Sequence, residues 1–308
     1  GLIQPIIHAL NKAGHVYPTA IQQQAIPLIL QGNDLLACAQ TGTGKTAAFL
    51  LPILQMLDET QNRPGSENRA TALILVPTRE LATQVGDSIN LYRGKLKLSY
   101  TVIFGGVPQR NQVRELEKKP NIIVATPGRL IDLLNQGHVN LSYIQFLVLD
   151  EADRMLDNGF IHDIYEIVGK IRGKRQTLLL SATINAGIGR IIKDFLHQHK
   201  SIEVQPASST VEKINQKVYY VEKANKTELL VELLEKEKIQ HVLVFTEMKH
   251  SADRLHKRLR QYGIESLAIH GGKSQEQRQR ALRDFKNKKI RVLVATDIAA
   301  RGIDIAKL

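Results

Sequence analysis

The segment from Leu35 to Thr46 constrains the fold of this chain more than any other. It begins with a short apolar run, passes through a turn rich in Gly and Thr, and ends in Gly44-Lys45-Thr46 before a second apolar stretch, Ala47 to Leu54. A strand, a glycine-rich loop and a helix in this order are what a phosphate-binding loop requires. Gly42 and Gly44 let backbone N–H groups approach phosphate oxygens where a Cβ would obstruct them.

In such a loop Lys45 reaches the β- and γ-phosphates, and the Thr46 hydroxyl takes a coordination position on Mg²⁺. The N-terminus of the following helix adds partial positive charge. The expected nucleotide-binding residues here are Ala39, Gln40, Thr41, Gly42, Thr43, Gly44, Lys45 and Thr46. Ala39 stands where the strict pattern has its first Gly, so an ordinary glycine-rich turn before a helix is the alternative.

The length and composition bound what the rest can be. A chain of 308 residues predicts about two domains. No apolar run approaches the length of a membrane span, and the N-terminal residues show no basic region followed by a hydrophobic one. Cys38 is the single cysteine, which excludes an internal disulfide and suits a reducing compartment. We therefore expect a soluble cytoplasmic protein with no membrane partner.

The charge suggests a polyanionic partner. Lys and Arg number 42 against 30 Asp and Glu, a net charge of +12. Nucleic acid is the usual partner of such a chain, and a solubilising surface is the alternative. His197 and His199 are two residues apart and would not share a helix face, so we expect no histidine metal site.

Two helices are expected before the loop, over 2–11 and 22–30. Thr19 and Gln22 have the spacing of a capping box, which gives Gln22 a structural role. A side-chain amide can also pair a donor and an acceptor with an adenine edge. By itself this segment favours the cap.

After the loop, apolar runs alternate with helical stretches. Strands are expected over 72–76, 100–104, 122–125, 146–149, 177–180 and 202–204. These runs are apolar throughout, which is typical of a parallel sheet covered on both faces. Polar or glycine-containing motifs follow five of the strands, and ligands of open α/β sheets bind outside the carboxyl ends of the strands. The sequence therefore predicts a composite site at one edge of the sheet.

The pattern breaks at a small, polar stretch around Pro206 to Thr210. We expect a first domain over 1–205, a linker over 206–215 and a second α/β domain over 216–308. The second series predicts strands over 217–221, 242–245, 266–269 and 292–295, with helices over 226–236, 251–262 and 275–285. It contains no phosphate loop of its own.

Asp150 and Glu151 follow the apolar run Phe146 to Leu149. In a nucleotidase Asp150 would hold Mg²⁺, partly through water, and Glu151 would orient and deprotonate the attacking water. An acidic helix start stabilised by the helix dipole is the alternative. The phosphate loop upstream favours the catalytic interpretation.

The motifs together resemble those of the DEAD-box ATP-dependent RNA helicases. The matching segments are 39–46, 77–82, 105–106, 126–129, 150–153, 181–183 and 295–304, and Asp150-Glu151-Ala152-Asp153 is the motif that names the family. The residues 154–160 resemble the bacterial RhlE-like branch. The resemblance covers the whole chain and implies two tandem RecA-like domains, ATP and Mg²⁺ as cofactors, RNA as the partner, and possible protein partners in RNA-processing or ribosome-assembly complexes.

The resemblance also implies residue roles that spacing could not supply. Gln22 matches the glutamine that reads adenine, and Tyr17 lies where a side chain can pack on the base. Asp153, Ser181 and Thr183 match residues that couple the state of ATP to unwinding. Gly302 and Asp304 match nucleotide-side positions of the second domain. The positions that match RNA contacts are Pro77, Thr78, Arg79, Gly105, Gly106, Thr126, Pro127, Arg129, Thr246, Gln275, Arg278 and Thr296.

The chain departs from the family pattern in three places. His15 replaces a common aromatic residue, and His270-Gly271-Gly272 replaces the usual His-Gly-Asp. The sequence ends at Leu308, before the His-Arg-Ile-Gly-Arg motif that carries the arginine finger, so we expect an incomplete second domain that binds ATP but is defective in unwinding. A DNA translocase and a non-enzymatic RNA clamp are the alternatives; the DEAD tetrad with Gln22 argues against the first, and intact Lys45 and Glu151 argue against the second.

Overall fold

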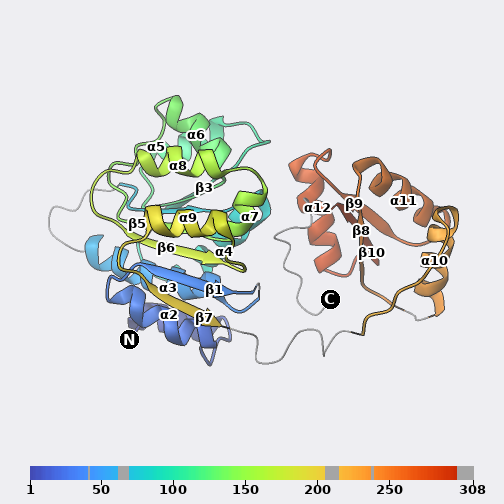
Figure 1. The fold of residues 1–308 in the computed structure, drawn as a ribbon, viewed down its shortest axis with the longest axis horizontal. Helices are drawn as coiled ribbons and strands as arrows, with labels where there is room; N and C mark the ends of the chain where they lie inside the picture. Colours follow the sequence, from blue (N-terminus) through green and yellow to red (C-terminus); the bar gives the residue numbers. More distant parts are fainter. Residues whose placement is uncertain (41, 62–68, 205–214, 237–238, 297–308) are drawn as a thin grey trace. The chain divides into compact units, whose positions relative to one another are not determined.

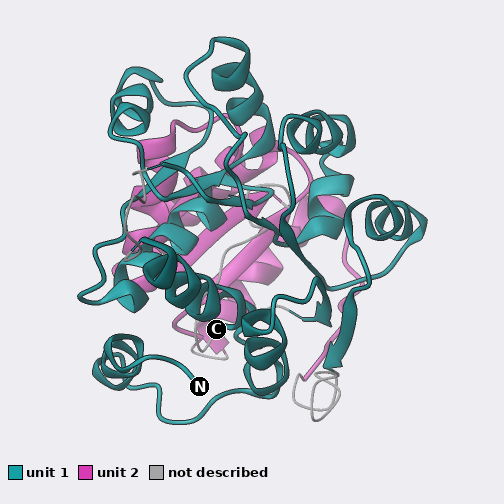
Figure 2. Ribbon diagram, turned by 90° about the vertical axis from the view of Figure 1, so that its left-hand side faces the viewer, with its two compact units in different colours: residues 1–212 teal, residues 213–308 magenta. Residues whose placement is uncertain are grey.

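The computed structural model describes residues 1–40, 42–61, 69–204, 215–236 and 239–296. The chain divides into two compact units, residues 1–212 and 213–308, coloured separately in Figure 2. Each is an α/β unit built on a wholly parallel sheet, as RecA-like domains are.

Unit 1 is organised around a seven-stranded sheet of order β3-β4-β2-β5-β6-β1-β7 (Figure 1). The strands are β1 (Leu35–Ala39), β2 (Ala72–Leu75), β3 (Tyr100–Ile103), β4 (Ile122–Ala125), β5 (Phe146–Leu149), β6 (Gln176–Ser181) and β7 (Lys200–Val204). The strands β2, β4 and β5 are buried along their whole length. Coverage on both faces explains why these sequences are apolar without alternation.

Two helical layers cover this sheet. One face packs α1 (Gln4–Lys12), α2 (Ala20–Leu30), α3 (Lys45–Gln61) and α4 (Arg79–Arg93). The other packs α5 (Arg110–Glu117), α6 (Pro127–Asn135), α7 (Ala152–Asp157), α8 (Ile161–Gly169) and α9 (Ala186–Phe195). Successive residues of one strand enter opposite cores, since Ile74 belongs to the first and Leu73 and Leu75 to the second.

Unit 2 has a three-stranded sheet of order β8-β10-β9 among its described residues. Its strands are β8 (Val242–Thr246), β9 (Ser266–Ile269) and β10 (Val292–Thr296), and its helices are η2 (Lys223–Asn225), α10 (Lys226–Lys236), α11 (Lys249–Gln261) and α12 (Gln275–Lys286). The central strand β10 is fully buried, whereas no residue of the edge strand β8 is.

The expected strand over 217–221 is wrong. These residues are irregular, and Val218 and Tyr220 are 78% and 98% exposed. A strand needs a neighbouring strand to receive its backbone hydrogen bonds, and none of the described strands pairs with this segment. The expected linker over 206–215 lies outside the described residues except for Asn215.

The helix after the phosphate loop is longer than the apolar run suggested. It spans Lys45–Gln61 and contains Pro52, which the helix accommodates in its buried middle. Among the described residues, none of the helices has the length and apolar character needed to cross a membrane.

Candidate functional site

Loops at the carboxyl ends of the unit 1 strands bring together the motifs that the sequence singled out. Because the sheet order is β3-β4-β2-β5-β6-β1-β7, these loops fall into two groups. The loops after β5, β6 and β1 carry the expected nucleotide residues, and those after β3, β4 and β2 carry the expected RNA contacts. The topology therefore divides one edge of the sheet into two adjacent halves with different chemistry.

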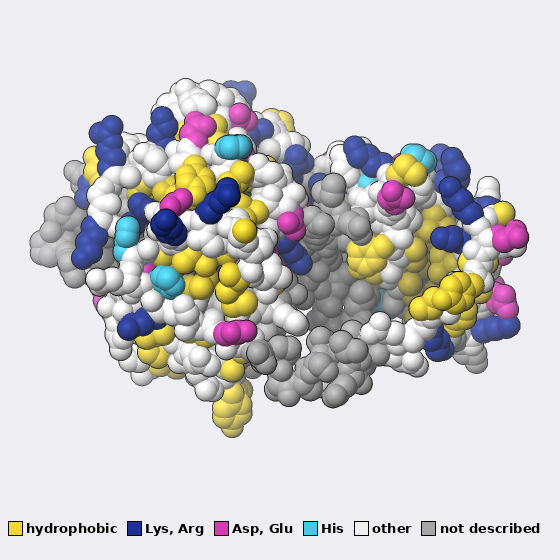
Figure 3. All heavy atoms as spheres, in the orientation of Figure 1, with side chains coloured by type: hydrophobic (Ala, Val, Ile, Leu, Met, Phe, Trp, Pro, Cys, Tyr) yellow, Lys and Arg dark blue, Asp and Glu magenta, His cyan; other side chains and the backbone are white. Residues whose placement is uncertain are grey.

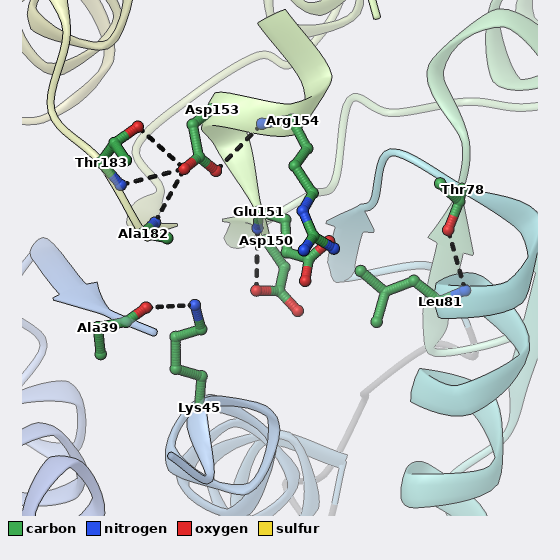
Figure 4. A network of polar contacts seen from close by, with 10 residues as sticks. All are labelled: Ala39, Lys45, Thr78, Leu81, Asp150, Glu151, Asp153, Arg154, Ala182 and Thr183. Atoms are coloured by element: carbon green, nitrogen blue, oxygen red, sulfur yellow. Dashed lines mark hydrogen bonds and ion pairs between the residues drawn. The ribbon is translucent and has the colours of Figure 1, made fainter. Parts of the chain in front are cut away.

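The phosphate loop joins β1 to α3. Gly42 and Gly44 have φ of 81° and 91°, a left-handed conformation that favours glycine. The Lys45 ammonium is buried and donates a 2.6 Å hydrogen bond to the Ala39 carbonyl (Figure 4). The Thr43 hydroxyl donates to the Gln40 carbonyl at 2.9 Å. The loop is thus held open by internal hydrogen bonds, with Thr46 in the first turn of α3; Thr41 lies outside the described residues.

Gln22 serves the cap and contacts the loop at the same time. Its Oε1 accepts from the Thr19 backbone N–H at 3.0 Å, which is one half of a capping box, and its Nε2 donates to the Gly44 carbonyl at 3.2 Å. A Cβ added at Gly44 would lie 2.5 Å from Gln22 Nε2. The amide expected to read a base is therefore already in contact with the phosphate loop, while the Tyr17 side chain is 87% exposed.

Asp150 is a buried acid at the end of β5. Its Oδ1 accepts from the Glu151 N–H at 3.0 Å. Its pKa is raised to about 7, chiefly by burial and also by the Glu151 charge, with Lys45 opposing the rise. Figure 4 shows the Lys45 ammonium and the Asp150 carboxylate on facing sides of one space. A buried carboxylate that resists ionisation is well suited to a cationic ligand, which would stabilise its charged form.

Glu151 is held in an unusual conformation. Its φ and ψ are 52° and 50°, in the left-handed region that a non-glycine residue rarely adopts, and it caps the N-terminus of α7. Its Oε2 accepts from Arg154 Nη1 at 2.7 Å, and its side chain is 9% exposed. The sequence analysis missed Arg154, although an acid and a base three residues apart on a helix are a recognisable pair.

Asp153 ties α7 to the loop after β6. Its Oδ2 accepts from the Ala182 N–H at 3.1 Å and from the Thr183 N–H and hydroxyl at 3.0 and 3.1 Å (Figure 4). The Ser181 hydroxyl, fully buried, donates to the Thr183 carbonyl at 2.7 Å. The expected coupling residues are therefore in direct contact with one another.

The helix α4 begins at the expected RNA half of the edge. The Thr78 hydroxyl accepts from the Leu81 N–H at 3.2 Å and caps the helix, directly after the buried Pro77. A Cβ on Gly106, whose φ is 78°, would lie 2.0 Å from Arg79 Nη1, and one on Gly105 would lie 3.7 Å from Nη2. The two glycines thus provide the space that the Arg79 guanidinium occupies.

The helix α6 begins beside it. Thr126 precedes the helix and Pro127 is its first residue, where a missing N–H costs nothing. Both terminal nitrogens of Arg129 donate to the Val107 carbonyl at 3.3 Å. Arg129 therefore fixes the loop after β3, and its side chain is 14% exposed.

In unit 2 the expected residues also follow strands or begin helices. Thr246 and Thr296 end β8 and β10, and Gln275 and Arg278 lie in the first turn of α12. His270, in the departing His-Gly-Gly turn, is buried and pairs with Asp253 Oδ2 at 3.1 Å. Gly302 and Asp304 lie outside the described residues, so their expected roles have no structural counterpart here.

Comparison with protein families gives two matches that cover most of the chain. A DEAD/DEAH box helicase family model matches residues 19–191, and a helicase conserved C-terminal domain model matches residues 225–308. The first match contains the phosphate loop, the Asp150–Asp153 motif and the start of α4.

Individual proteins are similar over nearly the whole chain. A DEAD-box ATP-dependent RNA helicase 52A of Oryza sativa subsp. japonica is 40% identical, covering 99% of this chain and 54% of its own length, so the chain spans about half the length of that curated relative. A DEAD box protein from Methanococcus jannaschii is 37% identical with a TM-score of 0.62, covering 99% of this chain and 81% of that one. A structure of S. cerevisiae dbp5 bound to gle1 and ip6 is 29% identical with a TM-score of 0.74, covering 99% and 75%.

Proposed function

The chain belongs to the DEAD/DEAH box helicase family, and on that premise we propose that it hydrolyses ATP to remodel RNA. The observation that supports this most strongly is the division of one sheet edge. Asp150, at the end of β5, faces Lys45 on one side, and the neighbouring strand β2 leads into expected RNA contacts on the other. A phosphate-binding half adjacent to a polynucleotide-binding half is the arrangement that coupling the two ligands requires.

ATP is the proposed nucleotide, bound by unit 1. Lys45 exchanges the Ala39 carbonyl for the β- and γ-phosphates, and the N–H groups around Gly42 and Gly44 cradle them. The Gln22 amide and the Tyr17 ring take the adenine. The Thr46 hydroxyl and the Asp150 carboxylate, both hard oxygen donors, fit Mg²⁺, which keeps most of its waters and binds few protein groups. When bound, Mg²⁺ neutralises charge on the phosphates.

Glu151 is the proposed general base. A carboxylate can accept a proton from the water that attacks the terminal phosphate. In the described structure one of its oxygens already accepts from Arg154, which holds the side chain in place and also competes with that water for the carboxylate. We infer that the Arg154 contact loosens when nucleotide and water enter.

Asp153 links hydrolysis to RNA. It is two residues from Glu151 and holds the loop of Ser181 to Thr183 through three hydrogen bonds. A shift of α7 on loss of the terminal phosphate therefore moves that loop. RNA itself is bound by hydroxyls, helix starts and guanidinium groups, which suit phosphates and carry little base information.

Glu151→Gln is the test of this function. The amide keeps the shape of the side chain but accepts no proton. With a segment that carries the arginine finger joined to the chain, RNA-stimulated ATP turnover should fall by about 10²–10⁴-fold while ATP affinity is retained. Glu115→Gln, on the exposed surface of α5, is the matched control. Turnover at the control's rate in Glu151→Gln would remove this residue from catalysis. Stimulation by DNA as strong as by RNA would indicate a DNA translocase.

The 308-residue polypeptide is proposed to bind ATP without unwinding RNA. The sequence contains no His-Arg-Ile-Gly-Arg motif, and an arginine finger is worth roughly 10³–10⁵ in rate where measured. Strand displacement by this polypeptide, followed with a labelled duplex, would contradict that proposal.

Three finer assignments are proposed from the sequence alone. The residues 154–160 support the bacterial RhlE-like branch. The single cysteine suits a reducing compartment and thereby supports a cytoplasmic location. RNA-processing or ribosome-assembly complexes are the proposed setting for protein partners.

A further inference from the structure

A polar pocket lies at the amino ends of the unit 1 strands, whereas the site described above lies at their carboxyl ends. Its volume is about 420 Å³, and it is lined by residues that immediately precede β1, β6 and β7, among them Gly32, Asp34, Gly173, Lys174, Arg175 and His197. These strands begin at this edge, so the pocket shares no residue with the phosphate loop. Pockets of this size hold small ligands or part of a larger one.

The one acid in the pocket lining is already engaged. Asp34 is buried, its Oδ1 accepts from the Thr177 N–H at 2.7 Å, and its Oδ2 accepts from the His197 N–H at 2.7 Å. Both oxygens therefore serve to join the starts of neighbouring strands. Because both of its oxygens are already hydrogen-bonded, Asp34 can contribute less to ligand binding than Lys174 and Arg175 can.

Arg175 carries an unmatched donor at this place. Its Nε is buried and has no hydrogen-bond partner within the described part of the chain. Burial lowers the pKa of its guanidinium, yet an arginine stays charged in proteins. A buried donor on a cation, left without an acceptor, is a costly arrangement. Asp34 offsets part of this positive charge, and the rest of the half-buried guanidinium lines the pocket, where it favours an anionic ligand.

The cations continue beyond the pocket along the same two loops. Lys170 and Arg172 precede Lys174 between α8 and β6, and Lys200, the first residue of β7, follows His197. These five side chains are exposed, whereas His199, between His197 and Lys200, is half-buried. Figure 3 shows Lys, Arg and His side chains on the left of unit 1, the side from which the strands of Figure 1 start.

The composition of the lining selects the kind of ligand. The pocket lining has no aliphatic side chain and no Phe, Tyr or Trp, since its residues are Gly, Asn, Asp, Lys, Arg, His and Gln. Protein partners are usually anchored by buried aromatic or aliphatic groups, and this surface offers no pocket for them. Phosphates on a flexible strand need only cations and donors in a row.

We propose that this pocket is a second phosphate-binding site, and that it takes backbone phosphates of RNA at the edge of the sheet opposite to the ATP site. The identification of the ligand as RNA rests on the proposed function. The prediction that the ligand is an anion rests only on the cations of the pocket. Gly32 and Gly173 have φ of 80° and 88°, with open space where a Cβ would stand, so the rim admits a phosphate closely.

The test compares two double variants of the full 308-residue chain. Lys174→Gln with Arg175→Gln removes two cations from the pocket, and Lys95→Gln with Lys97→Gln removes two exposed cations from the loop before β3, at the other end of the same sheet. Binding of single-stranded RNA is measured from 50 to 300 mM salt. For the pocket variant the slope of log affinity against log salt should fall by about 1.4, and affinity at 0.1 M salt by about tenfold or more; the control should match the wild type.

Backbone N–H resonances supply the second measurement. Those of Gly173, Lys174 and His197 should shift with RNA and with pyrophosphate in the wild type, and with neither in the pocket variant. If the loss of Arg175 disturbs folding, the single variant Lys174→Gln, at an exposed position, is measured instead. It should give half the change in slope.

Three results would count against the proposal. Equal slopes for pocket and control variants would overturn it. Shifts with pyrophosphate but not with RNA would replace RNA by a small phosphorylated ligand. If the wild type bound no RNA at all, the proposed function would fall, while the pyrophosphate shifts would still decide whether an anion site exists.

Discussion

The two units place polar residues at the carboxyl ends of parallel strands in different ways. In unit 1 the strands β2, β4 and β5 are buried throughout, and backbone hydrogen bonds join the residues at their ends, from Val76 to Ala125 and from Asp150 to Leu75. In unit 2 the strand β8 has no fully buried residue, and Phe245 in it is 55% exposed. The candidate residue Thr246 therefore stands on a much less rigid base than Asp150 at the end of β5.

Two aspartates make the difference concrete. Asp153 in unit 1 is buried and accepts three hydrogen bonds from a neighbouring loop. Asp253 in unit 2 is 37% exposed and pairs with His270 and with Lys273 Nζ at 2.8 Å. The comparison teaches that unit 1 holds Asp153 by buried contacts before any ligand arrives, whereas the contacts of Asp253 in unit 2 are partly exposed and contribute less.

The largest expected effect is on nucleotide affinity in unit 1. Lys45→Ala removes a buried cation from the phosphate loop, and hydrogen bonds to charged groups contribute about 1.5–3 kcal/mol each. Affinity for ATP, measured by calorimetry, should fall by roughly 10²-fold or more. Lys273→Ala in unit 2 is the control and should leave affinity unchanged. Equal losses in the two variants would mean that nucleotide binding is not a property of unit 1.

The next effect is on stability and depends on pH. The pKa of Asp150 is raised from 3.8 to about 7, so between these values the folded state binds more protons than the unfolded state, and stability falls as pH rises. Asp150→Asn removes this term while keeping the shape. Its advantage in unfolding free energy over the wild type should grow by roughly 2 kcal/mol from pH 5 to pH 7 and level off above about pH 8.

Urea denaturation without Mg²⁺ measures that difference. The pKa of Asp253 is lowered because hydrogen bonds from Lys273 and His270 outweigh its partial burial, so its contribution is fully present above about pH 5 and is lost only as pH falls below about 4. Asp253→Asn is therefore the control in unit 2, and its difference from the wild type should not grow between pH 5 and pH 7. A constant advantage for Asp150→Asn over that range would show that Asp150 is ionised throughout.

The third effect compares the two aspartates directly. Asp153→Ala removes the buried acceptor of three hydrogen bonds from the loop after β6 and should reduce the unfolding free energy by about 1.5–3 kcal/mol. Asp253→Ala breaks a partly exposed pair and should cost about 1 kcal/mol or less. Hydrogen exchange of each unit assigns the losses. A larger loss in unit 2 would reverse the ranking of rigidity drawn above.

Much of this fold follows from the sequence, because buried parallel strands are continuous apolar runs. The ranges 122–125, 146–149 and 266–269 were predicted with the bounds that the structure has. The segment 217–221 has the same apolar character and is wrong as a strand, since a run of apolar residues does not specify a neighbour.

The candidate site, too, was predictable in part. Lys45, Asp150 and Asp153 lie where the motifs predicted, because each motif directly follows a strand whose end fixes its position. Contacts across the fold could not be inferred, such as that of Gln22 with Gly44, because they depend on how helices settle on the sheet. Arg175 was missed for another reason: its interest comes from a buried nitrogen without a partner, which no sequence pattern reports.

The position of β1 between β6 and β7 has a consequence for synthesis on the ribosome. This strand pairs with β6 and β7, and Asp34 at its start accepts from Thr177 and His197, which follow it by 143 and 163 residues. The first strand made therefore has no neighbour until nearly all of unit 1 has been synthesised. We expect nascent chains stalled before β6 to lack ATP affinity and those extended past β7 to acquire it in one step, so that nucleotide binding reports the completion of the first unit.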